Sequence, residues 1–252
     1  MVIRPPVISI LVATWNCCQL LQNFLDSLLQ QDFQDWELLL LDNCSNDGTQ
    51  DVVESFRCSQ RGQRLVWSSC VDTGIYDAWN RGLGLARGEY LCFIGADDLF
   101  VSPSSLSRLA QLTAASPDLV TARNAYYSAD QRFLREWGAP WRWRRMRESM
   151  TIAHPGMLVH RRLFERFGGF DDRFQICGDY EWFLRLPVDL KAVHEESPIL
   201  KVVQAGVSHT KIRLVYAETF RAQRQHLALW FSAGCWLVNW LKYFRRRLIG
   251  LA

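Results

Sequence analysis

Net charge and paired cysteine motifs are both scarce in this sequence. Its 29 lysines and arginines against 26 aspartates and glutamates leave a formal net charge of only +3, which is too small to predict a nucleic acid partner. None of the eight cysteines belongs to a C-x-x-C pair, so a zinc site is not expected. A secreted disulfide scaffold would be shorter and denser in cysteine. We therefore expect reduced, mostly buried thiols in a cytoplasmic protein.

Long hydrophobic runs are missing as well. No stretch reaches the roughly 18 apolar residues that a membrane-spanning helix needs. The short apolar run near the N-terminus follows two prolines and leads into a polar turn, which predicts a first strand and not a signal peptide. The sequence has no internal repeats and no low-complexity linker. Its 252 residues, 49% of them hydrophobic, can build one large α/β domain with a short extension.

Strand and helix patterns alternate in the first half of the chain. Apolar, β-branched runs that are typical of strands buried on both faces alternate with segments whose large apolar residues recur at helical spacing. This order predicts an α/β fold with a mostly parallel sheet and flanking helices. The second half is more mixed, with a strand near 157–160 and a helix over 162–167. The expected elements of the first half are strands Val7–Ala13, Trp36–Leu41, Arg64–Ser69 and Tyr90–Ile94 and helices Gln19–Gln31, Thr49–Phe56 and Tyr76–Ala86.

Polar side chains follow three of these strands at the point where each strand ends. They lie in the segments Thr14–Asn16, Asp42–Asp47 and Asp97–Asp98. Ligands of parallel sheets bind beyond the carboxyl ends of the strands, so we expect the three segments to form one site. Two adjacent aspartates after a buried strand are costly without a cation, which predicts a metal site. An Asx turn or a helix cap ahead of Ser102-Pro103 is the alternative.

Four groups of motifs occur in order along the chain. They are the opening strand and Thr-Trp-Asn turn of Ile8–Asn16, the D-x-x-S-x-D-G-T loop of Asp42–Thr49, Gly74–Gly82 followed by Gly95–Asp98, and Gly168–Asp171 followed by Gly178–Glu181. Together, over roughly residues 7 to 210, they resemble the family 2 glycosyltransferases, which have the Rossmann-like GT-A fold. The resemblance implies an inverting enzyme that moves a sugar from a nucleotide-diphosphate donor to a hydroxyl of a glycan or lipid-linked acceptor in cell-surface polysaccharide synthesis. The donor is expected to be a UDP-sugar, with thymidine and guanosine left open.

The resemblance gives chemical roles to two carboxylate sites. Asp97 and Asp98 are expected to hold Mn²⁺ or Mg²⁺, which neutralises the diphosphate as it departs. Gly95 stands where many family members have an acidic residue, so it stays open which of the two aspartates binds the metal directly. Asp179 is expected to be the general base that takes the proton of the acceptor hydroxyl. The alternative for Asp179 is a cap at the N-terminus of the helix over 180–186.

The resemblance also predicts the residues that contact the donor. Asp42, with Asn43 beside it, is expected to accept a hydrogen bond from the nucleotide base. Thr73 stands where family members often have Lys or Arg, which weakens any expectation of a phosphate-pairing cation there. His154 either contacts acceptor or diphosphate or is a structural residue. The complete expected nucleotide-sugar site is Thr14, Asn16, Asp42, Asn43, Tyr76, Asn80 and Asp97.

We expect the glycosyltransferase domain to span residues 1–225 and an amphipathic helix to follow over 226–252. The segment 227–240 is rich in tryptophan and leucine, and Lys242 and Arg245 to Arg247 come directly after it. This composition is typical of a helix that lies on an anionic membrane surface, here the inner face of the plasma membrane. Packing against the domain is the alternative. The cluster Arg142–Arg147 is either a second anionic contact or a solvated face.

Two other functions compete with sugar transfer. A sugar-phosphate nucleotidyltransferase would need a Gly-rich, basic loop after the first strand, and Thr14–Cys18 has no such loop. A non-catalytic nucleotide-sugar-binding protein would explain the departures at Thr73 and Gly95. The retained Asp97, Asp98 and Asp179 favour a catalyst.

Overall fold

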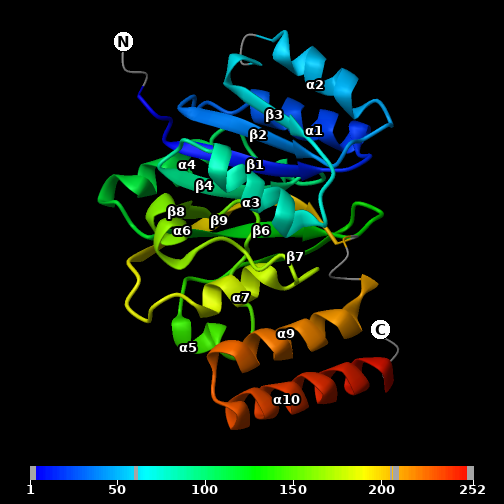
Figure 1. Ribbon diagram of the computed structural model, residues 1–252, viewed down its shortest axis with the longest axis vertical. Helices are drawn as coiled ribbons and strands as arrows, with labels where there is room; N and C mark the ends of the chain where they lie inside the picture. The colour runs from blue at the N-terminus through cyan, green and yellow to red at the C-terminus, as the bar shows by residue number, and fades with distance from the viewer. Residues whose placement is uncertain (1–3, 60–61, 205, 207–209, 249–252) are drawn as a thin grey trace.

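The apolar runs of the first half become strands in the computed structural model, three of them buried and β3 partly buried; the structure describes residues 4–59, 62–204, 206 and 210–248. The strands are β1 (Ile8–Thr14), β2 (Trp36–Asp42), β3 (Leu65–Ser69), β4 (Tyr90–Gly95), β5 (Leu99–Phe100), β6 (Leu119–Tyr127), β7 (Phe133–Trp137), β8 (Leu158–His160) and β9 (Ala192–Val203). The helices are α1 (Cys18–Leu29), α2 (Thr49–Arg57), α3 (Ile75–Leu85), α4 (Ser105–Leu112), α5 (Trp143–Met146), α6 (Arg161–Phe167), α7 (Gly178–Leu184), α9 (Ile212–His226) and α10 (Leu229–Leu248), with 3-10 turns over Gly62–Arg64 and Thr113–Ala115. The described strands form one sheet in the order β3-β2-β1-β4-β8-β6-β9-β5, with β7 paired to β6 (Figure 1).

Strand β1 lies in the middle of the parallel half of the sheet. Its apolar residues are almost fully buried, as its continuous run of Ile, Leu and Val predicts. It pairs in parallel with β2 on one side and with β4 on the other. Thr14 lies opposite Asp42, and Ala13 lies opposite Gly95. The carboxyl ends of three neighbouring strands therefore meet at one edge, which places the expected polar segments together.

The second half of the sheet is mixed. β8 runs antiparallel to both β4 and β6, whereas β6 and β9 pair in parallel. The register between β6 and β9 shifts at Ala122–Arg123 and again at Arg123–Ala125. These irregular strands mix polar and apolar residues without a clear period of two, so the sequence patterns do not indicate them.

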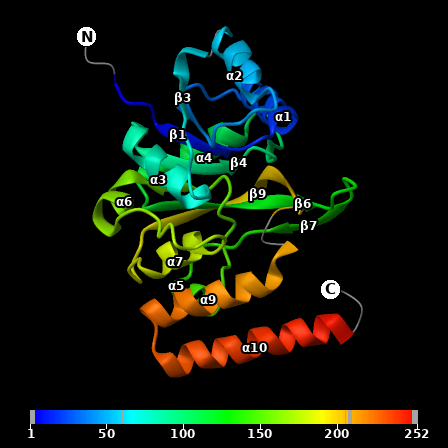
Figure 2. The same ribbon diagram turned by 45° about the vertical axis from the view of Figure 1, so that its right-hand side comes forward.

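Helices cover both faces of the sheet, as expected (Figure 2). α1, α2 and α4 bury apolar residues such as Phe24 and Leu109 against one face. α3, α6 and α7 cover the other face with a core rich in aromatic rings. Within it the rings of Phe164 and Trp182 stack with centroids 4.2 Å apart. Part of the candidate site packs against this aromatic core.

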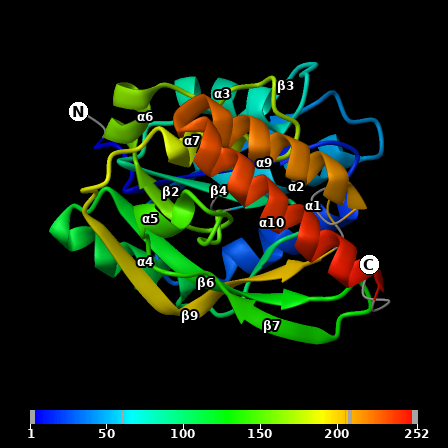
Figure 3. The ribbon, with the colours of Figure 1, turned by 90° about the horizontal axis from the view of Figure 1, so that it is seen from below.

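Helices α9 and α10 form a hairpin, with α9 between α10 and α7 (Figures 1 and 3). α9 is tied to α7 because Nε2 of His226 lies 2.6 Å from Oε1 of the buried Glu181. α10 packs on α9 through ring contacts such as Phe220 with Trp236, whose centroids are 5.9 Å apart. The break between the two helices falls close to the domain boundary expected at residue 226.

The length and apolar character that a bilayer-spanning helix requires are not combined in any helix of the described residues. The side chains of residues 242–248 and the whole of residues 249–252 lie outside the description. The basic cluster from Lys242 to Arg247 is therefore placed only as a stretch of α10.

The expectation of mostly buried thiols is wrong. Cys92 and Cys177 are buried, but Cys44, Cys58 and Cys70 are exposed. The three exposed cysteines follow the ends of strands and a helix and therefore lie in loops. None of the eight cysteines forms a disulfide in the part of the chain that the structure describes.

Candidate active site

Asp42 ends β2 with a carboxylate that is almost fully buried. It accepts hydrogen bonds from the hydroxyls of Thr14 (3.0 Å), Ser45 (2.5 Å) and Ser69 (2.7 Å) and from the backbone N–H of Ser45 (2.9 Å). Four bonds occupy the lone pairs of a carboxylate. The geometry therefore does not support the expected contact between Asp42 and a nucleotide base. Asp42 and the buried Thr14 instead join the ends of β1, β2 and β3.

Polar and aromatic groups form an open rim beside this buried cluster. The side chain of Trp15 is 68% exposed directly after β1. Asn16 has a left-handed backbone, with φ of +47°, and its Oδ1 accepts from the N–H of Asn46 at 2.9 Å. Oδ1 of Asn43 accepts from the N–H of Asp72 at 3.0 Å. Burial raises the pKa of Asp72, with a smaller opposing effect from its bond to a backbone N–H.

Asp97 and Asp98 lie in the turn after β4. Asp98 is 4% exposed, and its Oδ2 accepts from the N–H of Gly95 at 3.0 Å. Asp97 is half-buried and lines a cavity of about 220 Å³ between α1, β5 and β9. Burial, followed by the charge of Asp97, raises the pKa of Asp98 to about 8. A Cβ atom on residue 95 would lie 2.6 Å from Oδ1 of Asp97, so glycine is required while the two carboxylates fold back over this residue.

The donor chemistry of the Asp97–Asp98 pair fits a divalent cation. Mn²⁺ and Mg²⁺ prefer carboxylate oxygens, and a nearby cation stabilises the ionised form of a buried carboxylate. Within the described residues, no group of three or more His, Cys, Asp or Glu side chains could hold a metal. The two aspartates would hold the cation together with oxygens from the substrate and water, as is usual for Mg²⁺ at phosphate sites.

Asp179 is the second residue of α7, and its side chain is 21% exposed. Its carboxylate contacts two buried side chains. The hydroxyl of Tyr76 lies 3.3 Å from Oδ1, and Nδ1 of His154 lies 3.4 Å from Oδ2. The N-cap position of α7 is Cys177 and not Asp179, although Oδ1 of Asp179 accepts from the backbone N–H of Tyr180 in the first turn at 2.7 Å. The carboxylate is held from two sides and stays open to solvent.

The imidazole of His154 lies next to the carboxylate of Asp179 and is surrounded by aromatic rings. It packs against Trp79, Phe93 and Phe183, with centroids 5.3 to 5.6 Å away. The side chain is only 5% exposed, and this burial lowers the pKa of His154 more than the charge of Asp179 raises it. A buried, neutral imidazole supports the neighbouring carboxylate and has little surface for an acceptor or a diphosphate.

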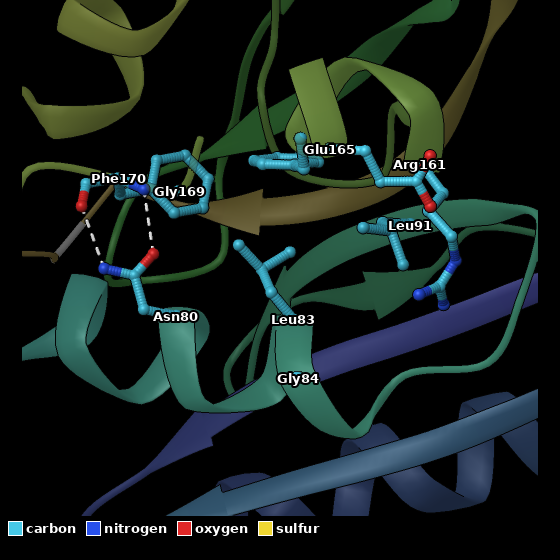
Figure 4. Close-up of a pocket in the computed structure, with 9 residues that line it drawn as sticks. Asn80, Leu83, Gly84, Leu91, Arg161, Glu165, Gly169 and Phe170 are labelled. Carbon is cyan, nitrogen blue, oxygen red and sulfur yellow. Dashed lines mark hydrogen bonds between the residues drawn. The ribbon is translucent and has the colours of Figure 1, made fainter. Parts of the chain in front are cut away.

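Tyr76 and Asn80 lie on one face of α3, as their spacing predicts, but this face meets the segment 168–178. The amide of Asn80 exchanges two 2.8 Å hydrogen bonds with the backbone of Phe170 (Figure 4). The hydroxyl of Tyr76 donates to the carbonyl of Ile176 at 2.5 Å, and the residue is 3% exposed. The geometry does not support the expected contacts of these two residues with ribose and diphosphate, because their polar groups bind the protein backbone.

A cavity of about 440 Å³ lies next to Asn80 and is separate from the carboxylate site. Leu83, Leu91, Arg161 and Glu165 also line it (Figure 4). Leu91 is the second residue of β4, whereas Asp97 and Asp98 follow the end of this strand. The cavity therefore lies near the start of β4 and not at the end that carries the two aspartates.

Residues 9–167 match the family model described as Glycosyl transferase family 2. The match covers more than half of the chain and includes Asp42, the Asp97–Asp98 pair and His154. The chain belongs to glycosyltransferase family 2. This confirms the resemblance inferred from the motifs. Asp179 lies beyond the matched stretch, so its role remains a prediction.

Curated relatives of this glycosyltransferase extend the similarity beyond the family model. A PGL/p-HBAD biosynthesis glycosyltransferase of Mycobacterium bovis (strain BCG / Pasteur 1173P2) is 33% identical over 182 residues, which cover 71% of this chain and 69% of the relative. A protein of Escherichia coli (strain K12) that is named for colanic acid biosynthesis, WcaA, is 25% identical over 234 residues, or 88% of this chain and 81% of WcaA.

Solved structures confirm the GT-A fold of this glycosyltransferase. S. aureus TarS 1–349 in complex with UDP-GlcNAc superposes with a TM-score of 0.71 and 17% identity, over 91% of this chain and 70% of TarS 1–349. The mannosyltransferase PcManGT from Pyrobaculum calidifontis, in complex with GDP-Man and Mn²⁺, gives a TM-score of 0.64 and 20% identity, over 92% of this chain and 74% of PcManGT.

The sequence analysis missed several residues of this glycosyltransferase that shape the site. Ser69 and Asp72 could have been predicted from the sequence. Ser69 ends β3 and Asp72 comes shortly after it, at the edge of the sheet where the other polar segments lie. Glu218 had no such signal, since it is one of several polar residues on a long helix. Its backbone partners lie 41 to 43 residues earlier.

Proposed function

We propose that this glycosyltransferase moves a sugar from a UDP-sugar to a hydroxyl of a glycan or lipid-linked acceptor, with inversion of the anomeric carbon, in cell-surface polysaccharide synthesis. The observation that carries the proposal is the combination of a paired-carboxylate turn after β4 with a separate, solvent-open carboxylate at Asp179. The first suits a diphosphate with its cation, and the second suits the removal of a proton.

The open rim supplies the groups for the nucleoside. The exposed ring of Trp15 offers a face on which a base stacks. Asn43 and Asp72 offer amide and carboxylate groups for the edge of a base or for ribose hydroxyls, in place of the saturated Asp42. UDP is favoured because TarS, which shares the fold, is described in complexes with UDP-GlcNAc and with UDP.

Asp97 and Asp98 would hold Mn²⁺ or Mg²⁺, which supplies positive charge to the departing diphosphate when bound. Asp179 takes the proton of the acceptor hydroxyl as its oxygen forms a bond to the anomeric carbon. The bond from this carbon to the diphosphate breaks, and the nucleoside diphosphate leaves with the electron pair. Attack opposite the leaving group gives inversion. Tyr76 and His154 keep the carboxylate of Asp179 in place.

The proposal is tested by mixing the purified protein with Mn²⁺ and a panel of UDP-, dTDP- and GDP-sugars. We expect UDP to raise the melting temperature, because selective binding stabilises the native state by about 2.7 kcal/mol at 100 times Kd. UDP release should stop in excess EDTA. Asp179→Asn should keep the UDP-dependent shift and lose turnover by orders of magnitude. If no nucleotide diphosphate changes the melting temperature, the proposal fails.

We further propose that α10 docks the enzyme on an anionic lipid surface, where lipid-linked acceptors are held. The helix has no charged residue between Leu229 and Leu241, and its outer face is apolar. Trp230 is 77% exposed, and Leu237 is also exposed. Such a face beside basic residues suits the headgroup layer. The exposed apolar residues are Leu229, Trp230, Trp236, Leu237, Val238 and Leu241.

Basic residues stand at both ends of this apolar face. The α5 segment meets the first turn of α10, because the guanidinium of Arg147 lies 5.0 Å from the ring centroid of Phe231. Arg142, Arg144 and Arg145 are exposed beside it. At the other end the sequence continues with the cluster from Lys242 to Arg247. Each such charge near anionic lipid contributes about 1 kcal/mol, so the charges favour a membrane as the partner of this face.

A further inference from the structure

Glu218 is a buried carboxylate in the middle of α9 that binds the loop before α7. Its Oε1 accepts from the N–H of Gln175 at 2.8 Å. Its Oε2 accepts from the N–H groups of Ile176 at 2.8 Å and Cys177 at 2.9 Å. Hydrogen bonds to an ionised acceptor are roughly twice as strong as neutral ones. Three successive backbone N–H groups on one carboxylate fix both the position and the orientation of this loop.

Tyr76 holds the same loop from the opposite side. Its hydroxyl donates to the carbonyl of Ile176. Ile176 is therefore bonded to Tyr76 through its C=O and to Glu218 through its N–H. The ring of Tyr76 also packs on Gly178, where a Cβ atom would lie 2.8 to 2.9 Å from ring carbons. A side chain at residue 178 would therefore push the loop and the ring apart.

The loop leads directly into Asp179. Gly178 begins α7 and Asp179 follows it, so the placement of the loop sets the position of the carboxylate. The groups that fix the loop come from α3 and α9. The turn that carries Asp97 and Asp98 belongs to neither helix.

We infer that Glu218 is a positioning residue for the general base Asp179, acting through the loop 175–177 with Tyr76 as a second support. The inference rests on the proposed function, in which Asp179 takes the proton. The base must lie within hydrogen-bond reach of the acceptor hydroxyl, and a displacement of about 1 Å lowers the rate about 100-fold. The effect is expected on turnover and not on donor binding, because the groups that fix the loop come from α3 and α9 and not from the rim or the Asp97–Asp98 turn.

The test is Glu218→Gln, which keeps the size of the side chain but replaces one acceptor oxygen by an NH₂ group that cannot accept from a backbone N–H. We expect kcat to fall about 10- to 100-fold. The donor KM and the UDP-dependent rise in melting temperature should not change.

Glu37→Gln is the matched control. Glu37 is also buried and accepts from the N–H of Arg87 and the hydroxyl of Ser9, both at 2.6 Å. It lies at the start of β2, at the opposite edge of the sheet from the site. This variant should lose a similar amount of stability and keep its kcat. Equal losses of kcat in Glu37→Gln and Glu218→Gln would overturn the inference, since both would then reflect general destabilisation.

Tyr76→Phe provides a second measurement that does not depend on the folding of Glu218→Gln. It removes one hydroxyl and keeps the ring on Gly178, and we expect a lower kcat with an unchanged donor KM. Native kcat in Tyr76→Phe, while Asp179→Asn is inactive, would overturn the inference and leave the proposed function standing. If Asp179→Asn turns over at the native rate, another residue is the general base.

Discussion

Asp98 holds its carboxyl group in a nearly dry environment, and this has a consequence for stability. Its pKa is raised from 3.8 to about 8, mainly by burial and then by Asp97. Between these values the native state binds a proton that the unfolded chain releases, so the free energy of unfolding falls as the pH rises. We expect the melting temperature in EDTA to decrease from pH 5 to pH 8. In Asp98→Asn the decrease in melting temperature over this pH range should be smaller. If the melting temperature decreases equally in the two proteins, the raised pKa does not belong to Asp98.

Trp15 is the exposed aromatic residue at the open rim. If its ring stacks on the base, Trp15→Ala should weaken UDP binding by about 1–3 kcal/mol, the usual loss for a base–aromatic contact. Titration calorimetry with UDP and Mn²⁺ measures this change. Trp230→Ala is the control, because this equally exposed tryptophan lies on α10. An unchanged Kd in Trp15→Ala would place the base elsewhere.

Individual residues differ in how far the sequence predicts them. Asp97 and Asp98 follow from a buried strand that ends in two carboxylates, and the structure places them at the expected edge. The position of Asp42 follows from the same pattern, but its hydrogen bonds do not. Two of its four donors, the hydroxyls of Thr14 and Ser69, belong to neighbouring strands whose register is set only in the folded sheet. A sequence shows that a carboxylate is present and does not show how many donors surround it.

At the scale of elements, α3 shows the limit of helical periodicity. The spacing of Tyr76 and Asn80 correctly predicts that they share a face. Their partners, Ile176 and Phe170, follow 100 and 90 residues later. No local pattern reports such contacts, so the expected donor contacts of this face came from the resemblance alone. The parallel strands β1, β2 and β4 were predictable, because apolar residues dominate each of them.

The hairpin provides a prediction about α10 as a separate element. α9 is anchored on its own, through Glu218 and through His226 with Glu181. A chain shortened after Ala228 should therefore unfold cooperatively and release UDP from UDP-sugar at a rate near that of the longer chain. Thermal denaturation and a donor hydrolysis assay measure the two properties. A shortened protein that aggregates would show that α10 is part of the core, and membrane docking should then be abandoned.

For the whole molecule, the proposed docking surface predicts selective binding to lipid. The protein should sediment with vesicles that contain phosphatidylglycerol and stay in solution with vesicles of phosphatidylcholine alone. High salt should reduce the binding, since charges near a surface are screened within about 10 Å at 0.1 M salt. The double variant Trp230→Ser with Leu237→Ser should lose most of the binding, because it removes exposed apolar area from α10.

Val71→Ser is the control for this experiment, because Val71 is exposed but lies in the loop after β3. It should bind vesicles as the unchanged protein does. If the unchanged protein instead sediments as a dimer without lipid, and the double variant is a monomer, then a second copy of the chain covers the face of α10.

The position of Glu218 along the chain has a consequence for how the enzyme is made. Glu218 follows Ile176 by 42 residues, although the two are in contact in the fold. Chains leave the ribosome N-terminus first and domains fold as they emerge, so the sheet edge with Trp15 and Asp97 is synthesised well before α9. On the proposed roles, the residues of the nucleotide site leave the ribosome before the segment that holds the base in place.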